Sequence, residues 1–476
     1  MSNEVVFGDK PDVSEISGPS HGTNVPQTYR LYRRRFVGLF ALMLLTIGGG
    51  LPGSWFGPIS NDVAAEFNFT LDQVNWLSNV INLAYLPCAL LAPVIATRFG
   101  IRNCCLLGGA ALVLSAWIRF AGTAKSLSPD GAYALLMLGS IISSLAQSVS
   151  QVMGPAYSET WFDLKGRTTA TMAVGIANPV GNAIGQLLSP AADDTRRSVL
   201  ILAIISSVIA PFVLLIGDAP PTPPTFSAST HQKHQQTLTS LFRAMLGLSV
   251  EESAFMSKRE RVDFVIVASI FAVLVAATNA FSILSAQVLQ PYGYSSDVAG
   301  FMGATLLLAG LIAALITAPL LDRVFTHPSA LARLTKVLAP LTGVGWFVLV
   351  WAIRPNNTGA LFAIFAVIGI CAIAMLPVGL ELSCELTRNA ESSSAVIWFM
   401  ANLLVVVFVL SLSALRRGED ASPPLNMKRS VIFLGIFCLA VTLTSWLIRG
   451  EAKRKALDQE KQNESMAVEM PVVSSA

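Results

Sequence analysis

The sequence predicts an all-α membrane protein whose twelve transmembrane helices form two six-helix, pseudo-symmetric bundles. The first observation behind this prediction is composition, because 53% of the 476 residues are hydrophobic and only 13% are charged. A soluble domain carries about 25% charged residues, so the expected solvent of this chain is the lipid bilayer. The second observation is a series of twelve apolar segments, and the third is an internal repeat at a spacing of six helices.

Each apolar segment is long enough to cross a bilayer, which takes about 20 mainly apolar residues. The predicted spans are, approximately, 36–59, 74–96, 103–123, 133–155, 168–190, 198–217, 263–289, 299–321, 334–353, 358–381, 392–415 and 429–448. The chain therefore divides into a polar N-tail (1–35), a first bundle (36–217), a polar linker (218–262), a second bundle (263–448) and a C-tail (449–476).

The distribution of basic residues predicts the orientation in the membrane. Twelve spans place both termini on one side, and most Lys and Arg residues outside the spans fall on that side. The positive-inside rule therefore predicts that both termini and the linker are cytoplasmic. The plasma membrane is the expected location, with a vacuolar or other endomembrane as the alternative. The N-tail has no apolar core near Met1, so we expect no cleavable signal peptide.

Two N-glycosylation sequons agree with this orientation. Asn68-Phe-Thr and Asn356-Asn-Thr both fall in loops predicted to be outside, whereas Asn463-Glu-Ser falls in the cytoplasmic C-tail. Asn68 and Asn356 are therefore the predicted acceptors, in short loops close to the membrane.

The internal repeat relates the two bundles. It pairs segments about 220–226 residues apart: 152–162 with 374–386, 177–181 with 401–405, and 92–98 with 318–323. Both 152–162 and 374–386 contain the pattern Met-x-Pro-x-x-x-Glu. Two six-helix halves related as parallel repeats describe the major facilitator architecture, in which substrate binds between the halves near the bilayer midplane and one half rocks on the other.

Polar side chains within the apolar helices predict a central cavity, because such side chains usually face the interior of a membrane bundle. The fifth span carries Asn178, Asn182 and Gln186 at i, i+4 and i+8, which places them in one stripe. The other predicted substrate-binding residues are Trp55, Asn82, Tyr85, Gln151, Asn279, Gln287, Trp398 and Asn402. The alternative is that these amides join helices through hydrogen bonds of about 1 kcal/mol each; the stripe favours the cavity.

Charged residues at the cytoplasmic helix ends predict an inner gate of ion pairs. The predicted gate residues are Arg98, Arg102, Glu159, Arg167, Asp322, Arg323, Glu381 and Glu385. Ordinary solvated charge is the alternative. The spans carry no deep carboxylate, which favours a facilitator over proton coupling, and Glu381 is the one serious candidate for a coupling group. Arg119, near the outer end of the third span, is predicted to extend to the membrane interface, with substrate contact as the alternative.

The remaining residue types point away from other chemistry. The six cysteines lie in or beside apolar runs without metal-ligand spacing, and the four histidines fall in tails or loops. We find no nucleophile–base pair and no basic patch with groove-reading motifs. We therefore expect no enzyme activity, cofactor, metal or nucleic acid, and a monomer in the bilayer whose partner is a small-molecule substrate.

Several stretches together resemble the feline leukaemia virus subgroup C receptor family, a branch of the major facilitators. They are "YRLYRRRFV", "QVNWLSNVINLAYLP", "FGIRN", "LSAWIR", "SLAQS", "NPVGNAIGQLLSP" and "LPVGLELSCEL". The resemblance covers about residues 28–448, and "PPTPPT" in the linker and Asn-Pro at 178–179 resemble one orphan branch. The family is associated with choline and ethanolamine movement, with haem export and, in one branch, with a pyridoxine-like vitamin.

The resemblance does not extend to the choline site. Choline-handling members use an aromatic pair on the first and seventh helices to hold the ammonium group by cation–π attraction. Gly53 and Asn279 occupy those two positions here, and Pro179 and Leu403 stand where the family has glutamines. Trp55 lies two residues beyond Gly53, and we expect it to line the path, with an interfacial aromatic belt as the alternative. Thr97 replaces a family aspartate between the second and third helices, whereas Asp322 keeps its counterpart in the second half.

These observations predict a transporter that moves a small organic solute, such as a metabolite, amine or vitamin-like compound, by alternating access. One alternative is an exporter of hydrophobic metabolites or drugs. Another, of a different class, is a non-transporting membrane receptor or scaffold, which would have no use for the polar stripe of the fifth span.

Overall fold

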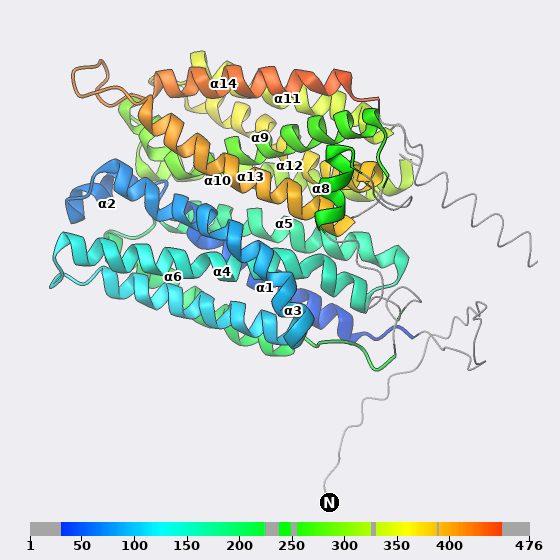
Figure 1. The fold of residues 1–476 in the computed structure, drawn as a ribbon. Coiled ribbons are helices and arrows are strands. Elements are labelled where there is room, and N and C mark those ends of the chain that lie inside the picture. Colours follow the sequence, from blue (N-terminus) through cyan, green and yellow to red (C-terminus); the bar gives the residue numbers. More distant parts are fainter. Residues whose placement is uncertain are drawn as a thin grey trace, which may run out of the picture.

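The computed structural model describes residues 30–222, 224, 238–248, 255–324, 330–387 and 390–449, and the regular elements in these ranges are helices. The first half contains α1 (Arg34–Ser54), α2 (Ser60–Phe67), α3 (Leu71–Gly122), α4 (Pro129–Trp161), α5 (Leu164–Leu188), α6 (Thr195–Ile209) and the 3-10 helix η1 (Ala210–Leu215). α8 (Leu238–Leu246) follows, and then the second half: α9 (Lys258–Leu289), η3 (Gln290–Tyr292), α10 (Ser296–Val324), α11 (Ala330–Ala352), α12 (Thr358–Thr387), α13 (Ala390–Ala414), α14 (Lys428–Leu443) and η4 (Thr444–Leu447). The long helices run side by side in two groups (Figure 1).

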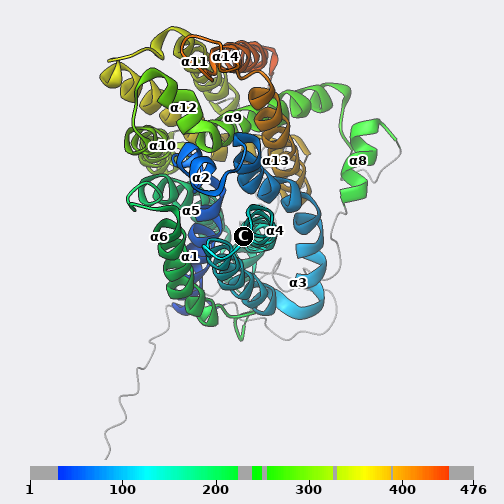
Figure 2. The same ribbon diagram turned by 90° about the vertical axis from the view of Figure 1, so that its left-hand side faces the viewer.

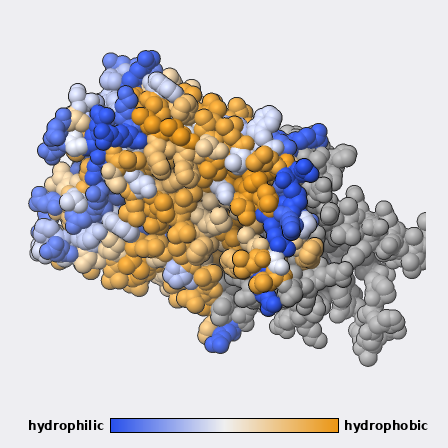
Figure 3. All heavy atoms as spheres, turned by 45° about the horizontal axis from the view of Figure 1, so that its top comes forward, coloured by the Kyte–Doolittle hydropathy of each residue, from blue (hydrophilic) through white to orange (hydrophobic). Residues whose placement is uncertain are grey.

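Eleven helices in the described part of the chain are long and apolar enough to cross a membrane. The twelfth predicted span is α5, which has the length but carries the polar stripe of Asn178, Asn182 and Gln186. Helix α5 packs against α1 and α4 of its own half and against α10 of the other half. On the face drawn in Figure 3, apolar residues cover the middle of the molecule and hydrophilic residues lie toward the ends.

A glycine divides α3 into the second and third spans. Gly100 has φ +83°, a left-handed conformation that glycine adopts without a steric penalty. The Asp218 carboxylate braces this turn by accepting a hydrogen bond from the backbone N–H of Arg102 at 2.8 Å. A Cβ at position 100 would meet Asp218 Oδ1 at 2.5 Å. A carboxylate from the end of the first half thus supports the turn where Thr97 replaces the family aspartate.

Each half has its own apolar core, and the halves meet along two helix pairs. The first core includes Leu45, Leu112 and Val149, and the second includes Phe281, Trp346 and Phe365. Helix α5 contacts α10, and α3 contacts α13. Figures 1 and 2 show these pairs at the boundary between the two groups of helices. The boundary is therefore lined by α3 and α5 of the first half and by α9, α10 and α13 of the second half, and the polar residues converge there.

Glycines bring α1 against α5 inside the first half. A Cβ at Gly181 would meet the Ile47 carbonyl oxygen at 2.1 Å, and one at Gly185 would meet the Leu51 carbonyl oxygen at 2.7 Å. These two glycines allow the backbones of α1 and α5 to approach closely. The close approach fixes the face that α5 turns toward the second half.

Candidate functional site

A small cavity lies between the two halves. It is lined from α5 by Asn178, Pro179 and Asn182; from α9 by Leu274, Val275, Thr278 and Asn279; from α10 by Leu307; from α12 by Ala372, Ile373 and Leu376; and from α13 by Trp398. None of these lining residues is charged. Five helices from both halves thus enclose an uncharged chamber with a few polar groups, an arrangement suited to a small organic molecule.

The α5 amides supply the polar side of this central cavity. Asn178 and Asn182 are 8% and 6% exposed. The Asn182 Nδ2 donates a hydrogen bond to Asn178 Oδ1 at 3.2 Å, which leaves Asn178 Nδ2 buried without a protein partner. An unpaired buried donor costs about 1–3 kcal/mol, so a ligand acceptor that pairs with it would be stabilised. Asn279 lies half-buried on the facing helix α9.

The opposite wall is mainly apolar and carries one aromatic ring. Trp398 of α13 is half-buried and packs edge-to-face on Phe271 with ring centroids 5.1 Å apart. Asn402 lies one turn further along, and its Nδ2 donates to the Trp398 carbonyl oxygen at 2.9 Å. Thr278 Oγ1 donates to the Leu274 carbonyl oxygen of its own helix at 2.9 Å. The hydroxyl and the Asn402 amide are therefore used locally, whereas the α5 pair keeps a free donor.

The third amide of the stripe joins the halves instead of lining the cavity. Gln186 is fully buried, and its Nε2 donates to the Ser282 carbonyl oxygen of α9 at 2.9 Å. Its amide also lies against α10, where a Cβ at Gly303 would meet Gln186 Oε1 at 2.4 Å. The stripe thus changes role along α5, from cavity wall at Asn178 and Asn182 to inter-half contact at Gln186.

Beyond Gln186, on the side of the molecule opposite α8, a polar network bridges the halves. Gln287 of α9 is 2% exposed, and its Nε2 donates to Asn75 Oδ1 of α3 at 2.6 Å. Arg416 donates to Gln287 Oε1 at 2.8 Å and pairs with Asp72 at 2.9 Å. Asn75 Nδ2 also donates to Ser413 Oγ of α13 at 2.9 Å. We call Asp72, Asn75, Gln287, Ser413 and Arg416 the outer network.

Two further contacts close the same side. Ser296 donates to Asp62 Oδ2 at 2.9 Å, and Asn61 donates to Gln290. The segment between α1 and α2 lies so close to α9 that a Cβ at Gly57 would meet the Ser282 carbonyl oxygen at 1.9 Å. The central cavity is therefore sealed on this side by direct contacts between the halves.

Three other predicted residues lie in the first half near these elements. Asn82 is 7% exposed, and its Nδ2 donates to the Ser78 carbonyl oxygen at 3.4 Å. Tyr85 is 1% exposed. Gln151 is half-buried with an unpartnered Oε1. None of the three borders the central cavity in this conformation, so their substrate contact stays a prediction.

Trp55 is not in the cavity wall. Its side chain is fully buried in the core of the first half, and its Nε1 donates to Ser198 Oγ of α6 at 3.0 Å. The hydrogen bond to Ser198 holds the indole against α6 within the first half, and Trp55 does not line the central cavity. Neither the path-lining role nor an interfacial belt agrees with this position.

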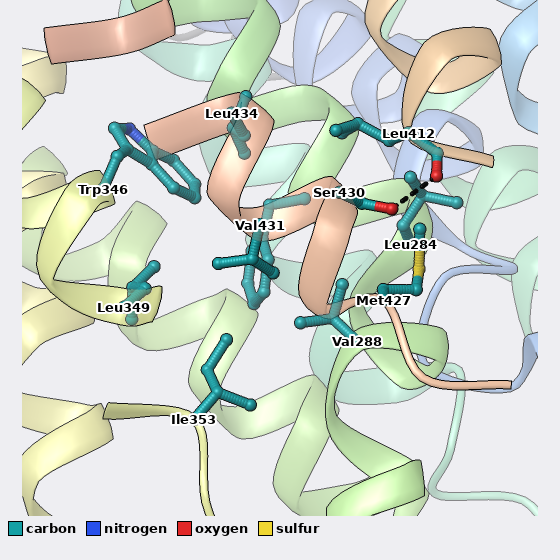
Figure 4. Close-up of a pocket in the computed structure, with 11 residues that line it drawn as sticks. Leu284, Val288, Trp346, Leu349, Ile353, Leu412, Met427, Ser430, Val431 and Leu434 are labelled. Carbon is teal, nitrogen blue, oxygen red and sulfur yellow. Dashed lines mark hydrogen bonds between the residues drawn. The ribbon is translucent and has the colours of Figure 1, made fainter. Parts of the chain in front are cut away.

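The second half has a cavity where the first half places that indole. Ser198 and Ser430 each stand in the first turn of the last helix of their half, and each donates to a carbonyl at the end of the preceding span, at 2.8 Å and 2.6 Å. Ser198 receives Trp55, whereas Ser430 borders an apolar cavity with Leu284, Val288 and Leu349 around it (Figure 4). This cavity lies within one half, so it is separate from the boundary across which the halves move.

The predicted inner gate lies mostly outside the described side chains. Arg98 and Arg102 are exposed, whereas the side chains of the remaining six fall outside the described residues: Glu159, Arg167, Asp322, Arg323, Glu381 and Glu385. The inner gate stays a prediction.

The interfacial prediction for Arg119 is wrong. Arg119 is 0% exposed, and its Nη2 donates to the Gly139 carbonyl oxygen at 3.2 Å. Gly139 leaves room for the side chain between α3 and α4, since a Cβ there would meet Arg119 Cγ at 2.5 Å. The guanidinium is thus held inside the first half instead of extending to the interface.

The sequence profile described as Major Facilitator Superfamily matches residues 39–409. The chain belongs to the major facilitator superfamily. Two six-helix halves around a central cavity agree with that membership, which makes this protein an integral, multi-pass membrane transporter of small solutes.

Relatives of this transporter confirm the resemblance to the feline leukaemia virus subgroup C receptor family. Solute carrier family 49 member A3 of Danio rerio is 26% identical over 452 residues, which cover 91% of this chain and 87% of the relative. The choline/ethanolamine transporter FLVCR2 of Homo sapiens is 25% identical over 479 residues, which cover 96% and 86%.

Solved structures confirm the fold of the transporter. A D-xylose-proton symporter superimposes with a TM-score of 0.64 at 14% identity, over 88% of this chain and 98% of the symporter. The nucleoside transporter NupG superimposes with a TM-score of 0.62 at 11% identity, over 87% and 100%.

The outer network was missed from the sequence, apart from Gln287. Its other members lie near helix ends and look like ordinary surface polar residues: Asp72, Asn75, Ser413 and Arg416. One signal was present, because Arg416 lies in a loop that is predicted to be outside, against the positive-inside trend. An arginine on the disfavoured side of a membrane indicates a local partner.

Proposed function

We propose that this transporter moves a small, uncharged, partly polar organic solute, and that the solute binds in the central cavity. The observation that carries this proposal is the unpaired Asn178 Nδ2 beside Asn182 in a chamber without charged lining residues. A carbonyl, hydroxyl or ring-nitrogen acceptor on the solute would satisfy the free amide donor. The apolar wall around Trp398 would cover the less polar face of the solute, as in a vitamin-like or similar metabolite.

An amine substrate fits the cavity less well. Choline and ethanolamine appear in the name of the human relative, and a quaternary ammonium is held by aromatic faces. Among the described residues that line the cavity, Trp398 is the single aromatic one and none is acidic. A cation bound there would lose its hydration, and no opposite charge in the cavity wall would offset that free-energy cost.

The outer network is the proposed gate on the side of the molecule opposite α8. The halves are joined there by α3, α9 and the Arg416 segment, so these contacts must break before the cavity can open to that side. The different burial of its members predicts that they contribute unequally to the stability of the closed gate. The Asp72 side chain is 60% exposed, and such ion pairs contribute little, whereas Gln287 and Asn75 are almost completely buried.

We further propose that the α8 side faces the cytoplasm, that the protein is a monomer in the plasma membrane, and that transport is facilitated diffusion. Basic residues support the orientation, and the uncharged cavity lining supports uptake without proton coupling.

A metabolite screen followed by flux measurements tests the proposed substrate class. The purified transporter is screened against neutral and charged metabolites by thermal shift, and compounds that bind are assayed for uptake into vesicles. We expect neutral compounds with an acceptor group to raise the melting temperature and to enter vesicles. Binding restricted to organic cations would contradict the proposal.

One observation favours a second candidate function, the export of hydrophobic metabolites or drugs. Most residues lining the cavity are apolar, including Leu274, Leu307 and Ile373. Export of a fluorescent hydrophobic dye from cells that overexpress the protein, unaffected by Asn178→Leu, would favour this function over the first.

A further inference from the structure

The short helix α8 presents large apolar side chains away from the protein. Phe242 is 52% exposed, Leu246 is 75% exposed and Leu248 is 53% exposed. The opposite face packs inward, because Leu241 and Ala244 are 3% and 1% exposed. An amphipathic helix with its apolar side chains pointing outward needs an apolar partner.

A contact with the start of α9 places the end of α8 relative to the spanning helices. Leu241 and Ala244 belong to the apolar core of the second half. Gly247, at φ +78°, ends α8 and lies against the Arg261 guanidinium. Helix α8 therefore lies level with the first turns of α9, where the span begins.

The direction of α8 matches a helix on the membrane surface. It runs across the long helices (Figure 1), and it lies beside the bundle and outside the ring of spanning helices (Figure 2). The start of α9, which lies beside the end of α8 at Arg261, also carries exposed apolar side chains, because Val262 and Val265 are 49% and 48% exposed. Exposed apolar side chains of α8 and of a spanning helix therefore occur in the same region.

Basic residues accompany this apolar face. Arg243 is exposed on α8, and Lys258 is exposed at the first residue of α9. Basic residues on the polar side of an interfacial helix attract anionic headgroups. The arrangement therefore provides apolar side chains for the acyl boundary and cationic side chains for the headgroups.

We propose that α8 and residues 247–248 form a lipid-binding surface that inserts Phe242, Leu246 and Leu248 into the boundary of the adjacent leaflet, with Arg243 and Lys258 on anionic headgroups. Because α8 also contacts α13, which lines the central cavity, the surface ties the lipid composition of that leaflet to a helix that must move during transport.

Site-directed fluorescence in the full-length transporter tests this surface. A Leu246→Cys variant carries an environment-sensitive label and is reconstituted in phosphatidylcholine vesicles that contain lipids with a nitroxide near the headgroup or near the chain end. Ile312→Cys, 60% exposed on α10, is the lipid control, and Asp420→Cys is the water control. The unsubstituted chain, labelled identically, corrects for native cysteines.

We expect the nitroxide near the headgroup to quench the Leu246→Cys label severalfold more strongly than the nitroxide near the chain end. A label as little quenched as that at Asp420→Cys would overturn the proposal, whether water, a second copy or another part of the chain covers the face. Adding phosphatidylserine should strengthen the quenching, and Arg243→Glu with Lys258→Glu should remove that gain. Quenching that is unchanged by phosphatidylserine would overturn the proposal that Arg243 and Lys258 bind anionic headgroups.

Discussion

At the scale of single residues, similar side chains have different roles because their partners differ. Asn178 and Asn182 line the central cavity and pair with each other, which leaves the buried Asn178 Nδ2 without a protein partner, whereas Gln186 on the same stripe bonds to the Ser282 carbonyl. The sequence predicts the stripe, since it depends only on a spacing of four. It cannot predict which amide meets a ligand and which meets the other half, since that depends on contacts about 100 residues apart.

Asn178→Leu should raise the solute concentration for half-maximal uptake by about tenfold, because one hydrogen bond contributes about 1 kcal/mol and the buried ligand acceptor would be left unpaired. Uptake kinetics in vesicles measure the change. Asn103→Leu is the matched control, since the Asn103 amide is exposed and bonds to its own helix. Equal kinetics for the two variants would remove Asn178 from the site.

Trp55→Phe should lower the free energy of unfolding by about 1 kcal/mol, since it deletes the hydrogen bond to Ser198 and keeps most of the buried ring. Thermal unfolding in detergent measures the loss. Solute affinity should stay unchanged, because the indole lies in the core of the first half. A large loss of solute affinity in a variant of normal stability would instead indicate that Trp55 lines the transport path.

At the scale of helices, the boundary between the halves depends on close backbone contacts and on the outer network. Glycines set the α1–α5 distance, and buried amides hold α3 to α9. The sequence indicates the glycines directly. It does not indicate the hydrogen bond between Asn75 and Gln287, because the two residues lie in different halves and neither belongs to the internal repeat.

Gly181→Ala should destabilise the transporter by more than about 2 kcal/mol, because the new Cβ would lie 2.1 Å from the Ile47 carbonyl oxygen and overpacking costs about 1–3 kcal/mol or more. Gly175→Ala on the same helix is the matched control, since nothing lies within 4 Å of its added Cβ. Thermal unfolding compares the two. Similar melting temperatures would contradict the close packing of α1 on α5.

Gln287→Leu should open the outer side more than Asp72→Asn. The first change removes one hydrogen-bond partner from each of Asn75 and Arg416, at a cost of about 1–3 kcal/mol to the closed state. The second removes a half-exposed ion pair worth about 0–1 kcal/mol. Spin labels at positions 125 and 419, in exposed loops of the two halves, would measure the distance between the halves on the outer side. A larger opening in Asp72→Asn than in Gln287→Leu would indicate that the ion pair between Asp72 and Arg416 holds the gate closed.

At the scale of the whole molecule, most of the architecture follows from the sequence. Twelve long helices in two related halves were predicted from apolar length and from the repeat at 152–162 and 374–386, and the superfamily match confirms that fold. Two features needed the structure, because both pair distant side chains: Asp218 bracing Gly100, and the buried Arg119 at Gly139. Apolar patterns specify helices, whereas individual polar contacts depend on how the helices pack.

Uptake into vesicles should follow the solute gradient and be insensitive to an imposed proton gradient, because no residue lining the cavity titrates near neutral pH. Flux measured with and without a pH difference across the vesicle membrane tests this. Accumulation driven by the proton gradient would show coupling and direct attention to the predicted inner gate at Glu381.

Protection of a cysteine in the cavity tests the central site most directly. Thr278 lies in the cavity wall on α9 and faces the boundary of the halves. A Thr278→Cys variant is exposed to a membrane-permeant alkylating reagent with and without the solute found by screening, and the unsubstituted chain controls for native cysteines. Binding between the halves predicts that saturating solute slows alkylation about tenfold, in line with occupancy of the site. Unchanged alkylation of a variant that still transports the solute would contradict it.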